Sequence, residues 1–203
     1  MPSRPDVTQR HRERREHSRR RILDVTRELL EDRPWSEVAI EDVTRRAELT
    51  RTEFYRHFRD KQSLLLALLE DVGLRLDLVA DPWERGGDGP DLVRAALRDL
   101  VAVFVEHGRL LQAIADAAAS DQEVHATYAS LGERLISSAA TRIAADVEAG
   151  RSEVADPGSV GAALVWMNER YLLAEFGRPP LGDPDRASAA LAEVWVRTVY
   201  GRA

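Results

Sequence analysis

The stretch VAIEDVTRRAELTRTEFYRHFRDKQSLL (residues 38–65) decides the fold of this chain. Near its start, Ile40, Val43 and Ala47 recur at intervals of three and four residues, which predicts one face of a short helix. The tight turn Glu48-Leu49-Thr50 follows and separates this helix from a second helical pattern. Two short helices joined by a tight turn are typical of a helix-turn-helix unit.

The second helix of this pair is expected over RTEFYRHF (51–58). Thr50 is a favourable N-cap for it, because a Thr oxygen can accept a hydrogen bond from a free N–H of the first turn. Phe54 and Phe58 are four residues apart, so they share one side of the helix, and we expect them to point inward. The opposite face carries Arg51, Thr52, Tyr55 and Arg56, with His57 beside them.

An amphipathic helix precedes this pair and ends before Pro34, which breaks helices. One face of it is formed by Ile22, Val25, Thr26, Leu29 and Leu30. The region therefore holds three short helices, which are the ingredients of a DNA-binding helix-turn-helix domain.

The outer face of the third helix has side-chain types that suit a major groove. Arginine can bond guanine O6 and N7 together, threonine can contact a thymine methyl group, and tyrosine and histidine can bond phosphate oxygens. Lys61, at the start of the next helix, is expected to present its charge to the DNA backbone. Glu53 has two interpretations: it accepts from a cytosine amino group, or it closes a capping box with Thr50, which we favour.

The N-terminal run RHRERREHSRRR (10–21) is strongly basic. Residues 1–21 hold eight arginines and three acidic residues, whereas the whole chain has a net charge of −6. The positive end of the chain is therefore its N-terminus. We expect residues 1–17 to form a flexible basic arm, which either contacts phosphates and the minor groove or is a solvated extension.

The remainder of the chain has helical patterns and no strand signal. A long apolar helix is predicted from Lys61 to Ala80, and the Pro- and Gly-rich stretch 82–90 is a linker. Further helices are predicted at 91–106, 108–119, 121–149, 157–176 and 184–200. The predicted fold is all-α, with about nine helices: a three-helix head and a larger helical body.

Capping residues support these helix limits. Ser120 and Glu123 fit a capping box, and the pairs Asp156-Pro157 and Asp183-Pro184 each place an acidic N-cap before a proline at the first helical position. Gly150 and Gly177 stand where helices are expected to end.

Composition and missing motifs exclude several classes of protein. The 203 residues include no cysteine and no run of about 18 apolar residues, so we expect neither a disulfide nor a transmembrane helix. The five histidines are scattered, and the chain has no HExxH, GxSxG or P-loop motif. We therefore expect a cytoplasmic protein that is no enzyme, with no cofactor, metal site or membrane association.

The segment FYRHFRDKQSL (54–64) matches the pattern aromatic–Tyr–x–His/Tyr–Phe–x–x–Lys–x–x–Leu, and the chain resembles the TetR family. The resemblance implies a homodimer that places two heads in successive major grooves of a double-stranded DNA operator. The DNA-contacting positions implied in this way are Thr50, Arg51, Thr52, Tyr55, Arg56, His57 and Lys61. The chain departs from the common pattern at Glu48 (often Gly), Ala39 (often Ser or Thr) and Glu53 (often small), which bears on the operator sequence.

Segments of the body, LLEDRPW (29–35), ALVWMNERYLLAEF (163–176) and VWVRTVYG (194–201), resemble the EthR type within this family. The resemblance implies a chamber for a small hydrophobic effector. Its lining positions are then Leu100, Phe104, Tyr128, Leu135, Val165, Asn168 and Trp195. From the residues alone Asn168 has two interpretations, because a buried amide needs a partner: it bonds a neighbouring helix, or it anchors a ligand.

The expected organisation is an arm (1–17), a helix-turn-helix domain (18–62) and a ligand-binding and dimerisation domain (63–203). The last helix carries apolar residues that suit either the core of one chain or a dimer interface, and the resemblance favours the dimer. These residues are Ala187, Leu191, Val194 and Val199. We expect a ligand-responsive repressor that leaves a palindromic operator when a small apolar ligand binds. The alternative is a ligand-binding or adaptor protein of the same fold that no longer binds DNA.

Overall fold

The computed structural model describes residues 7–80 and 89–201, in which every regular element is a helix. The elements are α1 (Val7–Asp32), the 3-10 turn η1 (Trp35–Glu37), α2 (Ile40–Ala47), α3 (Arg51–Tyr55), α4 (Lys61–Ala80), α5 (Gly89–Ala118), α6 (Gln122–Glu148), α7 (Pro157–Phe176) and α8 (Pro184–Tyr200). The absence of strands from these residues confirms the all-α fold. The chain divides into two units, Met1–Leu68 and Leu69–Ala203, and the boundary falls within α4.

The apolar faces of α1, α2 and α3 build the core of the first unit. Ile22 and Val25 of α1, Val43 of α2 and Phe54 of α3 are each at most 1% exposed. Phe58 is also buried, and its ring centroid lies 5.8 Å from that of Phe54. Both phenylalanines point inward as predicted, and burying each side chain contributes about 1.5–3 kcal/mol.

α1 begins at Val7, within the segment expected to be an arm; residues 1–6 lie outside the described residues. α2 and α3 are much shorter than α1, with 8 and 5 residues. The helix expected over 51–58 keeps α-helical geometry only to Tyr55, although the N–H of Phe58 still donates to the carbonyl of Phe54.

The turn between α2 and α3 depends on a backbone conformation and a cap. Glu48 adopts the left-handed conformation (φ 58°, ψ 38°) that favours glycine. Thr50 Oγ1 accepts from the Glu53 N–H at 3.2 Å, and Glu53 Oε2 accepts from the Thr50 N–H at 2.8 Å. This capping box confirms the favoured interpretation of Glu53, and its hydrogen bonds from the backbone and hydroxyl of Thr50 lower the pKa of the carboxyl group.

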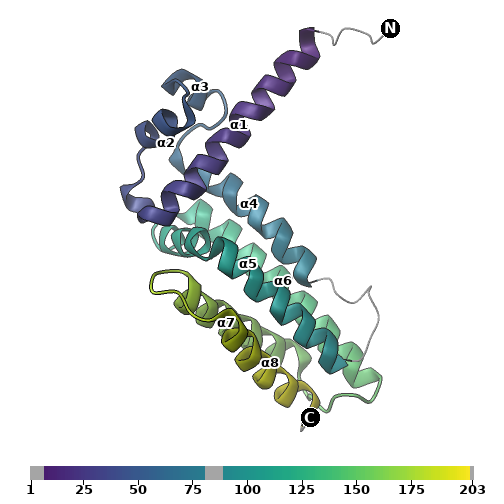
Figure 1. The fold of residues 1–203 in the computed structure, drawn as a ribbon. Helices are drawn as coiled ribbons and strands as arrows, with labels where there is room; N and C mark the ends of the chain where they lie inside the picture. The colour runs from purple at the N-terminus through teal and green to yellow at the C-terminus, as the bar shows by residue number, and fades with distance from the viewer. Residues whose placement is uncertain (1–6, 81–88, 202–203) are drawn as a thin grey trace, which may run out of the picture. The chain divides into compact units, whose positions relative to one another are not determined.

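In the second unit, α5, α6, α7 and α8 pack side by side (Figure 1). The prediction of separate helices at 91–106 and 108–119 was wrong, because α5 continues through Gly108. A Cβ atom at Gly108 would lie 2.5 Å from the carbonyl oxygen of Phe176. This glycine therefore allows α5 to approach the end of α7 instead of ending a helix. Most of the predicted linker, residues 81–88, lies outside the described residues.

Acidic N-caps begin α6, α7 and α8. Asp156 and Asp183 accept backbone hydrogen bonds before prolines, as predicted. The predicted cap Ser120 was wrong: Asp121 holds that position and accepts from the N–H groups of Glu123 and Val124. An aspartate can satisfy two free N–H groups of the first turn with one carboxylate oxygen, which explains the shift by one residue.

The glycines expected at helix ends differ in conformation. Gly150 follows α6 with φ 69°, as a left-handed residue after a helix should. Gly177 ends α7 with a right-handed φ of −77°, so its role was predicted for the wrong reason. A Cβ atom there would lie 2.5 Å from the Leu173 carbonyl oxygen and 2.8 Å from Gln112 Oε1, and close packing therefore explains this glycine.

A buried carboxylate connects the ends of α6 and α8. Asp146 is fully buried and accepts from Arg142 Nε at 3.0 Å, from Arg151 Nη2 at 2.6 Å and from the Tyr200 hydroxyl. Because each charge has partners, the network avoids the large cost of an isolated buried ion.

We predict that Glu48→Gly stabilises the protein by about 0.5–1 kcal/mol, because the left-handed conformation carries no Cβ penalty in glycine. Urea denaturation measures this difference. Glu48→Ala is the matched control, since it removes the charge and keeps the Cβ atom, and it should give no gain. Equal stability of the glycine and alanine variants would contradict the prediction.

Candidate functional site

The outward face of α3 presents a compact group of polar and aromatic side chains. Arg51, Thr52, Tyr55 and Arg56 are exposed, with Tyr55 44% exposed, whereas Phe54 between them is fully buried. The buried ring fixes the rotation of the helix about its axis. The four predicted outer residues therefore share one solvent-facing surface, and Thr50 adjoins it as the exposed N-cap.

Arg51 already has partners within the first unit. Its guanidinium forms an ion pair with Glu41 of α2, donates to the Tyr55 hydroxyl at 3.1 Å and lies 5.5 Å from the centre of the Tyr55 ring. Both members of the ion pair are exposed, so the pair contributes little to stability. Glu41 therefore orients Arg51 and places a negative charge beside the polar face.

His57 is half-buried at the edge of this face. Its Nε2 lies 2.9 Å from Ser18 Oγ of α1. Burial, followed by the nearby charges of Arg15, Arg56 and Arg19, lowers the pKa of His57 below its usual value. The imidazole is therefore neutral near pH 7, and its N–H group can donate one hydrogen bond to a phosphate without adding positive charge.

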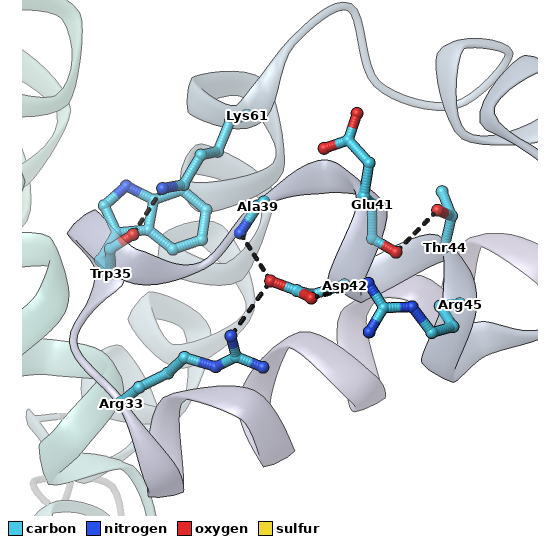
Figure 2. Close-up of polar contacts among 8 residues, drawn as sticks. All are labelled: Arg33, Trp35, Ala39, Glu41, Asp42, Thr44, Arg45 and Lys61. Atoms are coloured by element: carbon cyan, nitrogen blue, oxygen red, sulfur yellow. Dashed lines mark hydrogen bonds and ion pairs between the residues drawn. The ribbon is translucent and has the colours of Figure 1, made fainter.

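Lys61 is folded back onto the protein (Figure 2). Its ammonium donates to the carbonyl oxygen of Trp35 and lies 4.2 Å from the centre of the Trp35 ring. Burial lowers the pKa of Lys61. Figure 2 also shows the start of α2, where Asp42 accepts from the Ala39 N–H at 3.3 Å and pairs with Arg33 at 3.1 Å. Ala39 offers no hydroxyl, so Asp42 alone caps this end.

Arginines of the basic N-terminal run pack against the rest of the first unit. Arg15 donates to the Arg56 carbonyl at 3.5 Å, and Arg21 donates to the Arg46 carbonyl at 3.4 Å. The guanidinium of Arg19 lies 5.4 Å from the centre of the Phe58 ring. These residues of α1 place positive charge next to α3.

A cavity of about 140 Å³ lies within the second unit. It is lined by side chains of α5, α6, α7 and α8, and by Leu76 and Val79 of α4. All seven residues expected to line a chamber are brought together here: Leu100, Phe104, Tyr128, Leu135, Val165, Asn168 and Trp195. The walls are mostly apolar, as in small-molecule sites, with a few polar groups among them.

Asn168 supplies one of these polar groups. The indole Nε1 of Trp195 donates to Asn168 Oδ1 at 2.9 Å, and both residues are buried. An indole N–H is only a donor, so the bond fixes the amide orientation with its NH₂ group turned elsewhere. The contact with α8 confirms the first interpretation of Asn168, and the amide still borders the cavity.

A second polar pair lines the cavity from α6 and α7. The Tyr128 hydroxyl donates to Glu169 Oε1 at 2.6 Å. Burial, with the negative charge of Glu169, raises the pKa of Tyr128 far above its usual value, so the phenol keeps its proton. The phenol is thus a neutral donor that fixes the position of the Glu169 carboxylate.

Neither a metal site nor a membrane span is present in the described residues. Residues 7–80 and 89–201 contain no cluster of three or more His, Asp or Glu placed to hold a metal ion. None of the described helices has the length and apolar character that crossing a membrane requires.

Comparison with known families matches both units. Residues 22–68 match "Bacterial regulatory proteins, tetR family", and residues 93–201, more than half of the chain, match "Transcriptional regulator EthR, C-terminal domain". The chain is a TetR-family transcriptional regulator. Regulators of this family bind DNA through the helix-turn-helix and function as dimers, and they are not enzymes.

Curated relatives agree with this assignment. The regulator is 29% identical over 185 residues to the HTH-type transcriptional regulator EthR of Mycobacterium tuberculosis, covering 89% of this chain and 86% of the relative. It is 26% identical to EthR of Mycolicibacterium smegmatis over 184 residues, which cover 89% and 85% of the two chains.

Solved structures share the fold. A putative transcriptional regulator from Saccharomonospora viridis, in complex with choline, aligns with a TM-score of 0.76 and 17% identity over 92% of this chain and all of that one. PfmR, a TetR-family regulator from Thermus thermophilus, aligns with a TM-score of 0.74 and 18% identity, covering 88% of this chain and 98% of that one.

Three residues of this TetR-family regulator were not predicted from its sequence. Glu41 and Ser18 contact the α3 face through Arg51 and His57, but they belong to other helices, and nothing in their spacing signals those contacts. Glu169 lies next to Asn168 within the apolar stretch of α7. A charged residue one position from a predicted lining amide was a usable signal for it.

We predict that Trp195→Phe destabilises this regulator by about 1–3 kcal/mol, because the buried Asn168 carbonyl loses its donor. Urea denaturation measures the loss. The double variant Asn168→Leu with Trp195→Phe removes both polar partners and should cost less than the sum of the two single variants. Strict additivity would show that the hydrogen bond contributes nothing.

Proposed function

We propose that this regulator is a repressor that binds a palindromic DNA operator as a homodimer and leaves it when a small ligand fills the cavity. The observation that carries the proposal is the exposed face of α3, where arginine, threonine and tyrosine side chains surround a buried phenylalanine anchor. Such a helix can enter a major groove while its inner side stays in the protein core.

The residues of this face differ in the DNA groups that they can contact. Arg51 and Arg56 can read guanine, and Thr52 can contact a thymine methyl group. Thr50, Tyr55 and His57 can bond phosphates and fix the register. Lys61 would reach a phosphate only after leaving Trp35, so we assign it a weaker part than the resemblance implied.

The cavity supports ligand control. It is lined by apolar residues with few polar groups, which suits a small amphipathic or apolar molecule. The Saccharomonospora viridis protein was solved with choline, but at 17% identity it indicates a shared fold and does not identify a ligand for this chain. A ligand that binds one conformation of the protein more tightly than another shifts the population toward that conformation. The factor by which the ligand then changes the affinity for DNA equals the factor by which DNA changes the affinity for the ligand.

Exposed apolar side chains on α7 and α8 support the homodimer. Trp166 is 50% exposed and Val194 is 41% exposed. Ala187, Leu191 and Val199 are buried within one chain, so they belong to its own core. The dimer surface is therefore narrower than the sequence pattern indicated, with Val194 as its apolar residue on α8.

One observation favours the second candidate, a ligand-binding protein that no longer binds DNA. Glu41 engages Arg51 and places a negative charge where a phosphate would approach. Selection of duplexes from a random-sequence DNA library by the purified protein decides between the two. Failure to enrich any sequence would favour the second candidate.

We predict that Tyr55→Ala and Arg56→Ala each weaken binding to the selected duplex about 10- to 100-fold, since one base or phosphate contact contributes about 1–3 kcal/mol. Gel shifts at fixed salt measure the affinity, and size-exclusion chromatography should show an unchanged dimer. Arg178→Ala, which removes a charge from the second unit, is the matched control. Equal affinity of all three variants would rule out α3 as the recognition helix.

We predict that Glu41→Gln strengthens operator binding about 3- to 10-fold at low salt, because it removes a repulsive charge and releases Arg51 for the DNA. The slope of log affinity against log salt should steepen by about one if Arg51 gains a phosphate contact. Glu106→Gln in the second unit should change neither quantity. Weaker binding by Glu41→Gln would mean that Glu41 positions Arg51 for recognition.

A further inference from the structure

Glu169 is the single charged residue that lines the cavity in the part of the chain that the structure describes. It lies on α7 next to Asn168, and its carboxylate accepts from the Tyr128 hydroxyl at 2.6 Å. The surrounding walls are leucine, valine, alanine and aromatic side chains. One carboxylate is thus built into a mostly apolar chamber.

Within the part of the chain that the structure describes, no cationic side chain pairs with this carboxylate. Across residues 7–80 and 89–201, the Tyr128 hydroxyl is the only hydrogen-bond or ion-pair partner of Glu169. This differs from the buried Asp146 in the same unit, which has two arginines and a tyrosine around it. The Glu169 carboxylate is only partly buried, so it relies on solvent for the rest of its solvation.

The charge decides which ligands can fill the cavity. A neutral apolar ligand would displace water from a carboxylate and give nothing in return, which is unfavourable. A ligand with its own carboxylate would add repulsion between like charges at low dielectric. A protonated amine would replace the lost water with an ion pair and a charge-assisted hydrogen bond.

Aromatic rings in the lining favour the same chemistry. Tyr128 and Trp166 lie with Glu169 in the lining, and Phe104 and Trp195 complete an aromatic set. The faces of aromatic rings attract cations, and the attraction grows when water is excluded. The rings also pack well against an apolar ligand body.

We propose that the effector of this cavity is a small amphiphile with an apolar body and a protonated amine, which is held by the Glu169 carboxylate. The inference rests on the proposed ligand-binding function and goes beyond it by naming the chemical class of the ligand. Tyr128 acts as a positioning residue that holds the carboxylate toward the cavity.

Three probes with the same body test the proposal: 4-phenylbutylamine, 4-phenylbutan-1-ol and 4-phenylbutanoate. They differ only in carrying a positive, neutral or negative head at neutral pH. Isothermal titration calorimetry on the full chain gives each affinity. The amine should bind at least tenfold more tightly than the alcohol, and the carboxylate should bind most weakly.

Variants assign the preference to Glu169. Glu169→Gln should lower the affinity for the amine at least tenfold while leaving the alcohol within threefold, since shape is kept and charge is lost. Tyr128→Phe keeps the carboxylate, so it should keep a preference for the amine. Glu133→Gln, on the exposed side of α6, is the matched control and should change nothing. Circular dichroism checks that each variant is folded.

The outcomes separate this inference from the proposed function. If the alcohol binds as tightly as the amine and also releases the selected DNA, ligand control stands and the amine preference is overturned. If Glu169→Gln leaves amine binding unchanged, the amine lies elsewhere and the inference fails. If none of the probes binds, both the inference and the ligand-binding part of the proposed function fail, while the DNA-binding part is tested separately through α3.

Discussion

The hydrogen bond from Trp195 to Asn168 is the constraint on which the second unit depends. It joins α7 to α8 through two buried side chains, so the loss of either partner would leave the other buried polar group without this hydrogen bond. Because the bond holds both side chains at the cavity wall, the chamber keeps a fixed polar end while the rest of its surface is mostly hydrocarbon. A cavity without such a bond would be free to collapse around leucine and valine side chains.

In the first unit, buried side chains and hydrogen bonds hold a short helix in place. α2 and α3 are too short to be stable alone, so Phe54 and Phe58 anchor α3 while Thr50 and Glu53 cap it. The inward-facing ring of α3 is thus occupied in holding the helix. The outward side chains are left available for DNA, with one exception: Arg51 is paired with Glu41. Lys61, which lies beside this face, is likewise held by Trp35.

Much of this could be predicted from the sequence because helical periodicity and caps are local. The spacing of Ile40, Val43 and Ala47 and the Thr50–Glu53 box each depend on residues within one or two turns. The continuity of α5 was not predicted, because the close approach that Gly108 allows involves Phe176, far away in the chain. The lining residues followed from the family resemblance, whereas the Tyr128–Glu169 pair joins two helices, and its one local signal was the position of Glu169 beside Asn168.

Trp166 gives the second unit a property that its packing alone does not suggest. The indole is half exposed to solvent and also lines the cavity, whereas Trp195 is buried and hydrogen-bonded. In the single chain, water and an occupant of the chamber would therefore contact the same fluorophore. We expect the colour and intensity of the Trp166 emission to change when the chamber is filled.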